Sequence, residues 1–453
     1  MSRAKIAVGA FVALLVLLVL AAGYSVFQRF FQQDAGPAAA APPEGPPPAS
    51  PKTPPAPAAY QGFLYGRVTT VEGGTYEGRL RWGGDQEAFW GDYFNGPKHG
   101  NAWLAQVPPG QHPVERHKIS ILGFQILERK APAKLDRIFM VPFGEIARIE
   151  ARGRDVRVLL KNGTVADLDR LGASDIDDGL RIWDARRGTV FLDSLRIRAV
   201  ELLATAPLAA PGRLQGTVHT RQGDFTGFIQ WNRDDCVGTD ELSGDTAGKA
   251  LKLRFDTLRS IARSRDGVRV TLLDGREIDL SDTPDVGHDN LGIYVDDPRY
   301  GRVKISWNTF ERADFRPGDS GPAYGDFPPE RPLTGSVTTR AGRRLAGRLV
   351  FDLDESETSD TLDSSFQGVD YILPFGRIAA IVPPVPGQDG NQNARVTLGS
   401  GEELRLESVG DLGPGNAGLL IFAEGGKSPE YVPWTDVERV DLEPATSSPG
   451  PFS

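Results

Sequence analysis

Carboxylate side chains gather in three loops of this sequence. The loops span residues 83–92, 232–241 and 352–360, and each follows an alternating apolar segment that ends in an aromatic residue. Clustered carboxylates on a loop can hold Ca²⁺ through their oxygen atoms. The candidate binding residues in these loops are Asp85, Glu87, Asp234, Asp235, Asp352, Asp354 and Glu355.

Two interpretations of these loops stay open. No stretch has the spacing of an EF-hand loop, and exposed turns are commonly acidic in a chain whose net charge is −9. The alternative to a calcium site is therefore a solvated acidic surface. Glycoside hydrolysis would need one defined pair of carboxylates, and no pair stands out in the sequence. Apart from Ca²⁺, we expect no metal and no cofactor.

Residues 318–322, Gly-Asp-Ser-Gly-Pro, are one glycine short of the sequence around the nucleophile of chymotrypsin-like serine proteases. A serine nucleophile needs a histidine within hydrogen-bond reach, a group that orients it and a rigid scaffold. Here five prolines lie between 317 and 332, a composition typical of a linker. We therefore predict that Ser320 is not catalytic.

Aromatic residues recur at two positions along the chain. Trp82, Trp231 and Phe351 occupy one position, and Trp307 and Trp434 occupy the other. Recurrence at the inward phase of a strand favours core packing over ligand stacking, because each copy of a repeat needs the same packing residue.

The first copy carries additional tryptophans. Trp90 and Trp103 have no counterpart in the other copies, and they are the candidate aromatic residues for binding a glycan.

The composition argues against several classes of function. A net charge of −9 does not suit a protein that binds nucleic acid, which needs a basic surface. Cys236 is the one cysteine, which excludes an intramolecular disulfide framework and a cysteine-ligated metal cluster.

The N-terminal residues predict a membrane anchor followed by a stalk. Residues 6–27 carry no charge and are long enough to span a bilayer, with Arg3 and Lys5 before them. We assign 1–32 to a signal-anchor helix with its N-terminus in the cytoplasm, so the bulk of the chain is periplasmic or extracellular. A signal peptide cleaved near Gly23 is the alternative. Residues 33–59 are a Pro/Ala-rich disordered linker, either an extended polyproline II spacer or a flexible tether.

The remaining sequence repeats itself. The pattern L-x-G-x-V-x-T begins at Leu64, Leu214 and Leu333, and each copy continues with alternating segments around a glycine turn. We predict module 1 at 60–206 with an insertion at 95–137, module 2 at 207–318, a linker at 319–332, module 3 at 333–443 and a disordered tail at 444–453.

These patterns predict an all-β fold of three tandem modules, each a small barrel or a sandwich of curved sheets. The rhythm V-x-L-x-x-G-x-x-x-x-L resembles that of SH3-like and Sm-like small barrels. This resemblance implies a strand arrangement and no catalytic motif.

We therefore expect a non-enzymatic, membrane-tethered scaffold or binding protein whose partner is an envelope protein or a cell-wall glycan. The alternative is a carbohydrate-active or other hydrolytic enzyme with its site near the insertion of module 1.

Overall fold

The computed structural model describes residues 61–443 except 84–85, 99, 109, 112–113, 122–123, 133–137, 171–178, 206–211, 319–320, 328, 386–392 and 427, and only the backbone of 114–121 and 124–132. The predicted anchor, linker and tail, together with Asp85 and Ser320, lie outside the described residues. The described part is all-β, as the sequence predicts, with short 3-10 turns between strands. Within it, no helix has the length and apolar character needed to cross a lipid bilayer.

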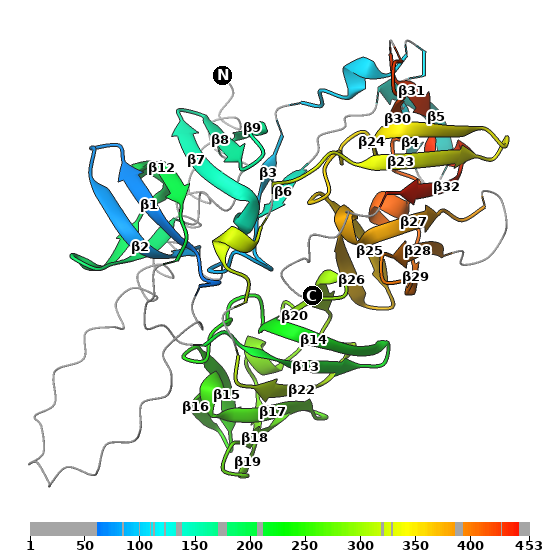
Figure 1. The fold of residues 1–453 in the computed structure, drawn as a ribbon. Helices are drawn as coiled ribbons and strands as arrows, with labels where there is room; N and C mark the ends of the chain where they lie inside the picture. Colours follow the sequence, from blue (N-terminus) through cyan, green and yellow to red (C-terminus); the bar gives the residue numbers. More distant parts are fainter. Residues whose placement is uncertain are drawn as a thin grey trace, which may run out of the picture. The chain divides into compact units, whose positions relative to one another are not determined.

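The first sheet has eight strands in the order β11-β10-β2-β1-β12-β7-β8-β9 (Figure 1). Its strands are β1 (Tyr65–Thr70), β2 (Thr75–Trp82), β7 (Ile146–Arg152), β8 (Asp155–Leu160), β9 (Val165–Asp169), β10 (Leu180–Asp184), β11 (Gly188–Leu192) and β12 (Ile197–Leu202).

The second sheet has twelve strands in the order β16-β15-β19-β18-β17-β22-β13-β14-β20-β21-β26-β25. Its strands are β13 (Gln215–Thr220), β14 (Gly223–Gln230), β15 (Glu241–Thr246), β16 (Lys249–Arg254), β17 (Leu258–Arg263), β18 (Gly267–Leu272), β19 (Glu277–Ser281), β20 (Ile293–Asp297), β21 (Gly301–Ile305), β22 (Phe310–Arg316), β25 (Thr361–Phe366) and β26 (Val369–Pro374).

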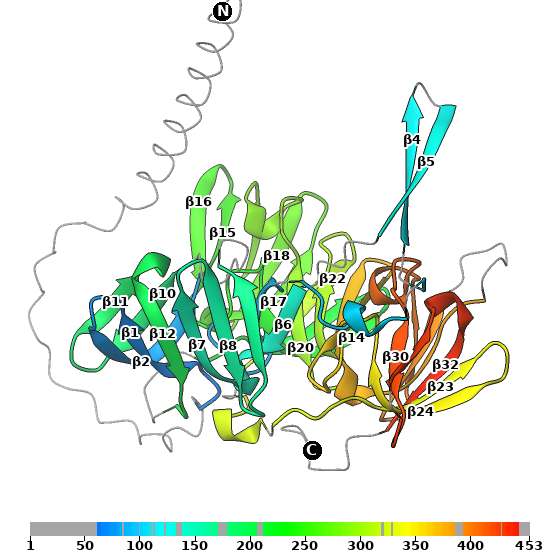
Figure 2. The same ribbon diagram turned by 90° about the horizontal axis from the view of Figure 1, so that it is seen from above.

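The third sheet has eight strands in the order β29-β28-β27-β32-β23-β24-β30-β31. Its strands are β23 (Thr334–Thr339), β24 (Arg344–Val350), β27 (Ile378–Val382), β28 (Ala394–Leu398), β29 (Glu403–Leu406), β30 (Leu419–Phe422), β31 (Glu430–Val432) and β32 (Val437–Leu442). Two further pairs are separate: β3 (Tyr93–Pro97) with β6 (Ile138–Pro142), and β4 (Val114–Ile121) with β5 (Phe124–Pro132), a two-stranded ribbon visible in Figure 2.

Eight strands follow one order in all three large sheets. Read from β11, β21 and β31, the orders are β11-β10-β2-β1-β12-β7-β8-β9, β21-β20-β14-β13-β22-β17-β18-β19 and β31-β30-β24-β23-β32-β27-β28-β29. The pairing registers also shift at matching points, between Thr69 and Thr70, between His219 and Thr220, and between Thr338 and Thr339. Such irregularities bend a strand and increase its twist, so the three sheets curl at the same place.

The recurrent aromatic residues lie in the core, as predicted. Trp82 and Trp231 are fully buried, and Phe351 is 1% exposed. Each ends the second strand of its sheet or directly follows it, and each forms a backbone bridge to the residue four positions on. The same backbone bridge therefore recurs after each of these strands, beside a buried aromatic residue.

The predicted insertion of module 1 connects the first sheet to the third. β3 pairs with β6, and the residues after β3 pack onto the third sheet. Trp103 contacts Phe422 of β30 edge to face, with ring centroids 6.0 Å apart. Asn101 Nδ2 donates a hydrogen bond to the Leu353 carbonyl at 2.8 Å. We call residues 98–107 the strap.

Candidate metal centre

The turn between β24 and β25 brings three carboxylates together. Oxygen atoms of Asp352, Glu355 and Asp411 all lie within 4.8 Å of one another. Asp352 and Glu355 come from the turn itself, and Asp411 comes from the 3-10 turn η9 (Gly410–Leu412). Three hard oxygen donors at this separation suit a divalent cation such as Ca²⁺.

Burial makes this cluster electrostatically costly without a positive charge. Glu355 Oε2 is buried and, within the described part of the chain, has no hydrogen-bond partner. Burial raises the pKa of Glu355 well above its ordinary value, and the neighbouring Asp411, Asp354 and Asp352 raise it further. Because every one of these influences disfavours the charged form, the turn must take up either a proton or a cation.

Backbone donors hold two members of the triad in place. The Ala417 amide donates to Asp352 Oδ1. The Asp363 amide donates to Asp411 Oδ2 at 2.6 Å. These bonds fix one oxygen of each carboxylate, and they orient both groups towards the turn before any ligand binds.

The corresponding turn after β14 has the same backbone and a different polar content. Asn232 stands where Asp352 stands, Asp235 where Glu355 stands, and Asp285 where Asp411 stands. The first two residues of each turn have positive φ, 51° and 68° in one and 49° and 54° in the other. The Ser243 amide donates to Asp285 at 2.8 Å, as the Asp363 amide does to Asp411.

An amide replaces the third carboxylate in this turn. Asn232 Nδ2 donates to Asp285 Oδ1 at 3.0 Å, and Asn232 Oδ1 accepts from the Leu291 amide at 2.8 Å. One side chain therefore satisfies the carboxylate and the backbone donor together. Asp352 can accept from the backbone, but as a carboxylate it has no hydrogen to offer Asp411.

The remaining carboxylate of the second turn responds to burial in the same direction. Burial, with Asp240, Asp285 and Asp234 nearby, raises the pKa of Asp235 to about 8. A carboxylate with a raised pKa thus occurs in both turns. Among the described residues, the cluster of three carboxylates occurs at the turn after β24.

Lys98 of the strap neutralises the next carboxylate of the acidic turn. Its Nζ lies 2.5 Å from Asp354 Oδ1. Burial alone would lower the pKa of Lys98, but Asp354 and Asp360 outweigh this effect and raise it. Asp354 is thus already paired, which leaves Asp352, Glu355 and Asp411 as the candidate cation ligands.

The other acidic loops serve contacts between sheets. Glu87 is buried, accepts from Cys236 Sγ at 3.4 Å and lies 4.0 Å from Arg79. Asp234 is exposed, and its backbone carbonyl accepts from Arg81 at 3.0 Å. Of the six predicted acidic residues that the structure describes, Asp352 and Glu355 are the two that lie in one cluster.

The candidate glycan-binding tryptophans face protein. Trp90 is 9% exposed and packs against Phe228 of β14. Trp103 is covered on one side by Phe422 and on another by the Arg348 guanidinium, 5.4 Å from the ring centre.

A buried ion network joins the first and second sheets. Arg302 donates to Asp92 and to Asp296, each at 2.8 Å, and Arg213 lies 3.4 Å from Asp296. All four side chains are at least nine-tenths buried. Burial raises the pKa of Asp296, opposed by Arg302. Each charge is paired, so the network fixes the two sheets together.

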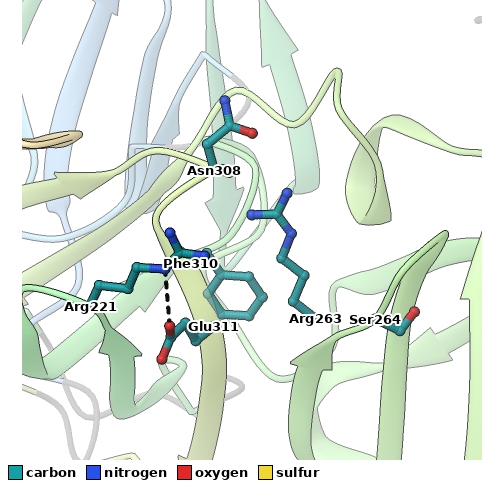
Figure 3. Close-up of a pocket in the computed structure, with 6 residues that line it drawn as sticks. All are labelled: Arg221, Arg263, Ser264, Asn308, Phe310 and Glu311. Atoms are coloured by element: carbon teal, nitrogen blue, oxygen red, sulfur yellow. Dashed lines mark ion pairs between the residues drawn. The ribbon is translucent and has the colours of Figure 1, made fainter.

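A polar pocket of about 310 Å³ lies on the second sheet (Figure 3). Its guanidinium groups are already engaged: Arg221 lies 3.5 Å from Glu311, and Arg263 donates to the Trp307 carbonyl at 2.8 Å. Glu311 is the single carboxylate among its lining residues. The pocket thus lacks the paired acid and base of a hydrolase.

Asp411 and Lys98 were missed by the sequence analysis. Asp411 stands in a segment, Asp-Leu-Gly, that aligns with Asp285-Val-Gly, so this sequence similarity carried the signal. The pairing of Lys98 with Asp354 depends on how the strap crosses to the third sheet, and no local pattern indicates this.

No protein-family model matches this chain, and neither a curated protein nor a solved structure matches it.

Proposed function

We propose that this chain is a non-enzymatic scaffold protein built of three copies of one β module, and that its third module binds a calcium ion. The copies are those predicted from the sequence, at 60–206, 207–318 and 333–443. Residues 1–32 anchor the scaffold in a membrane, and residues 33–59 are the stalk. The modules lie in the periplasm or outside the cell, and their partner is an envelope protein or a cell-wall glycan.

The shared strand order supports the repeat. Eight strands follow the same order in each sheet, the register shifts match, and the same aromatic turn recurs. Three unrelated sheets would have no reason to agree in all these features. The small-barrel or sandwich character of the module is part of this proposal, supported by the curling that the recurrent bulges impose.

Fixed contacts between the modules support a scaffold. The buried network around Arg302 links modules 1 and 2, and main-chain pairing of β21 with β26 links modules 2 and 3. The strap links modules 1 and 3 through Lys98 and Trp103. Charged groups at these boundaries pair with one another rather than face a cavity, which suits a rigid binding surface better than an active site.

The cluster of Asp352, Glu355 and Asp411 is the observation that carries the calcium proposal. The cluster lies at the contact between the strap and the third sheet, because Asn101 and Lys98 of the strap donate hydrogen bonds to residues of the same turn. A bound cation would remove the repulsion within the turn and stabilise the contact of module 1 with module 3.

A thermal melt of the full-length chain with Ca²⁺ and with EDTA tests this function. A ligand that binds only the folded state stabilises it by about 2.7 kcal/mol at a concentration of 100 times its Kd. We expect Ca²⁺ to raise the melting temperature of the wild type and to leave that of Asp352→Asn unchanged. The matched control is Asp224→Asn, which removes a well-exposed carboxylate of module 2 and should keep the response. Equal melting in Ca²⁺ and EDTA for the wild type would contradict the proposal.

A further inference from the structure

Modules 2 and 3 are joined by one main-chain junction that can be compared with open strand edges elsewhere. β21 pairs antiparallel with β26 in the register Arg302↔Ile372, Val303↔Tyr371, Lys304↔Asp370 and Ile305↔Val369. The inward residues Val303 and Tyr371 are 0% and 6% exposed. On the opposite face, Lys304 lies 3.9 Å from Asp370. The strand β21 of one module thus pairs with the β25–β26 hairpin of the next, and strand addition of this kind also joins separate proteins.

Among the described residues, β11 and β16 are edge strands at positions that match those of the junction. β11 is the counterpart of β21, and β16 is the counterpart of β26, since Phe255 follows β16 as Phe375 follows β26. Both are terminal strands of the sheets in the described part of the chain (Figure 2). Val190 occupies in the β10–β11 pair the position that Val303 occupies in the β20–β21 pair. Leu251 occupies in the β15–β16 hairpin the position that Tyr371 occupies in the β25–β26 hairpin.

The inward apolar residues of these two edges are incompletely covered. Val190 of β11 and Leu251 and Leu253 of β16 are half-buried, whereas their counterparts in the junction are buried. Phe191, on the other face of β11, is 57% exposed. A missing neighbouring strand explains both observations.

The corresponding strands in the other copies differ. β6 of module 1, another counterpart of β26, already has its inward Phe139 and Val141 buried at 7% and 2% exposure. β31 of module 3, another counterpart of β21, carries Glu430 at the position of Val303. Among these counterpart strands, half-buried inward apolar residues therefore occur in β11 and β16, whereas β6 exposes an apolar side chain, Ile138, only on its other face.

We propose that β11 of one copy of this chain pairs with β16 of a second copy, in the register of β21 with β26. The inference rests on the proposed repeat, which supplies the register. It places Val190 opposite Leu251 on the inward face and Thr189 opposite Lys252. Phe191 then lies over Ala250, whose small side chain leaves room for the ring.

The charges on β16 disfavour its pairing with itself. Lys249, Lys252 and Arg254 are exposed on β16, so pairing of β16 with itself would set like charges opposite one another. β11 carries no charge and meets no such penalty. Because the two surfaces differ, a contact between two copies leaves β16 free on one copy and β11 free on the other. Each free strand can bind a further copy, so the contact builds a ring or an open chain of copies.

Cross-linking of two tagged full-length chains tests the register. One chain carries Phe191→Cys and the other Ala250→Cys, and a short bifunctional maleimide joins thiols that lie close together. Cys236 is buried and should not compete. We expect a covalent dimer of the two tags. The matched control replaces Ala250→Cys with Asp370→Cys, the equivalent position of β26, whose edge β21 already covers, and should give no dimer. Failure of the first pair, or equal yield with the control, would overturn the proposal.

A charge exchange tests the same contact by sedimentation in mild detergent. The mass of the wild type should rise with concentration. Phe191→Lys should abolish this rise, because it places a cation beside Lys252, which lies on the same face of β16. Adding Ala250→Asp in the same chain should restore it, since the two residues recreate the pair of Lys304 with Asp370. A wild type that stays monomeric, or a double variant that stays monomeric, would refute the pairing.

The outcome is separable from that of the proposed function. Phe191→Lys alters an exposed side chain, so its melting temperature and its response to Ca²⁺ should equal those of the wild type. Lost association with unchanged melting supports the pairing. Unchanged association in a normally melting Phe191→Lys variant would refute the pairing and leave the scaffold and its calcium site standing.

Discussion

The turns after β14 and β24 share one backbone but differ in what their side chains can do. Both have two residues of positive φ, an aromatic residue beneath them, and a backbone amide that donates to the more distant aspartate. In module 2, Asn232 donates to Asp285 and completes the hydrogen bonding. In module 3, Asp352 lies beside Asp411 and Glu355, and the turn accumulates negative charge.

This comparison separates the structural role of the turn from its chemistry. The backbone bridge and the aromatic residue under it recur in all three modules, so they belong to the fold. The side chain that follows the aromatic residue differs between the two turns, because Asn232 donates a hydrogen bond to Asp285 whereas Asp352 adds a third carboxylate.

Trp231→Ala should have the largest effect. Its indole is fully buried, and Nε1 donates to the Asp285 carbonyl at 2.8 Å. Truncation leaves a cavity and removes one of the two hydrogen bonds to that carbonyl, since Asn290 Nδ2 also donates to it at 3.0 Å. We expect the substitution to cost about 3–5 kcal/mol in chemical denaturation. Trp231→Phe is the matched control, because Phe351 occupies this position in module 3, and it should cost much less. A Trp231→Ala variant as stable as the wild type would show that the aromatic residue is not a packing requirement of the module.

Asn232→Asp should make the turn of module 2 resemble that of module 3. It replaces the donor to Asp285 with an acceptor, and we expect destabilisation of about 1–3 kcal/mol in EDTA. Added Ca²⁺ should reverse part of this loss, which denaturation curves with and without the ion would measure. The reciprocal Asp352→Asn should stabilise module 3 in EDTA. If Asn232→Asp leaves the free energy of unfolding in EDTA unchanged, the difference between the two turns does not affect the stability of the protein.

Asp235→Asn should change how stability depends on pH. The folded pKa of Asp235 is about 8, against an ordinary value of 3.8, so the folded state holds its proton more tightly than the unfolded state does. The contribution of Asp235 to the free energy of unfolding is then fully present below about pH 4 and is lost as the pH rises towards 8. Removing the group should make the decline between pH 5 and pH 8 shallower, measured from unfolding midpoints at each pH. The exposed Asp266→Asn is the control for lost charge and should keep the wild-type slope. A decline that Asp235→Asn leaves as steep would contradict the assignment.

Ser320→Ala should have the smallest effect. Ser320 lies outside the described residues, and a substitution in a proline-rich segment between modules should shift stability by less than about 0.5 kcal/mol. Any hydrolytic activity found in the wild type should be unaffected, as an assay of both proteins would show. Loss of such an activity in the variant would favour an enzyme over a scaffold.

The period-two alternation and the glycine turns predicted the strands, because each strand buries one face and exposes the other. The burial of Trp231 also followed from its recurrence. What the sequence could not provide was the pairing between modules. The junction of β21 with β26 and the contact of Lys98 with Asp354 join residues far apart in the chain. Such contacts depend on how whole sheets pack, which local patterns do not encode.

The candidate site was predicted only in part for the same reason. Asp352 and Glu355 are neighbours in one acidic loop, so composition identified them. Asp411 comes from a different turn and is recognised only once the copies are aligned with Asp285 in view. Asp85, Glu87, Asp234 and Asp354 matched the same composition, but a count of carboxylates does not distinguish a residue paired with Lys98 from one that faces two other carboxylates.

Equilibrium dialysis of the metal-free, full-length chain against labelled Ca²⁺ tests the contrast between the two turns most directly. The account predicts one bound ion per wild-type chain, none for Asp352→Asn, and a second, weaker equivalent for Asn232→Asp. Binding that Asp352→Asn leaves unchanged, or a wild type that binds no calcium, would contradict it.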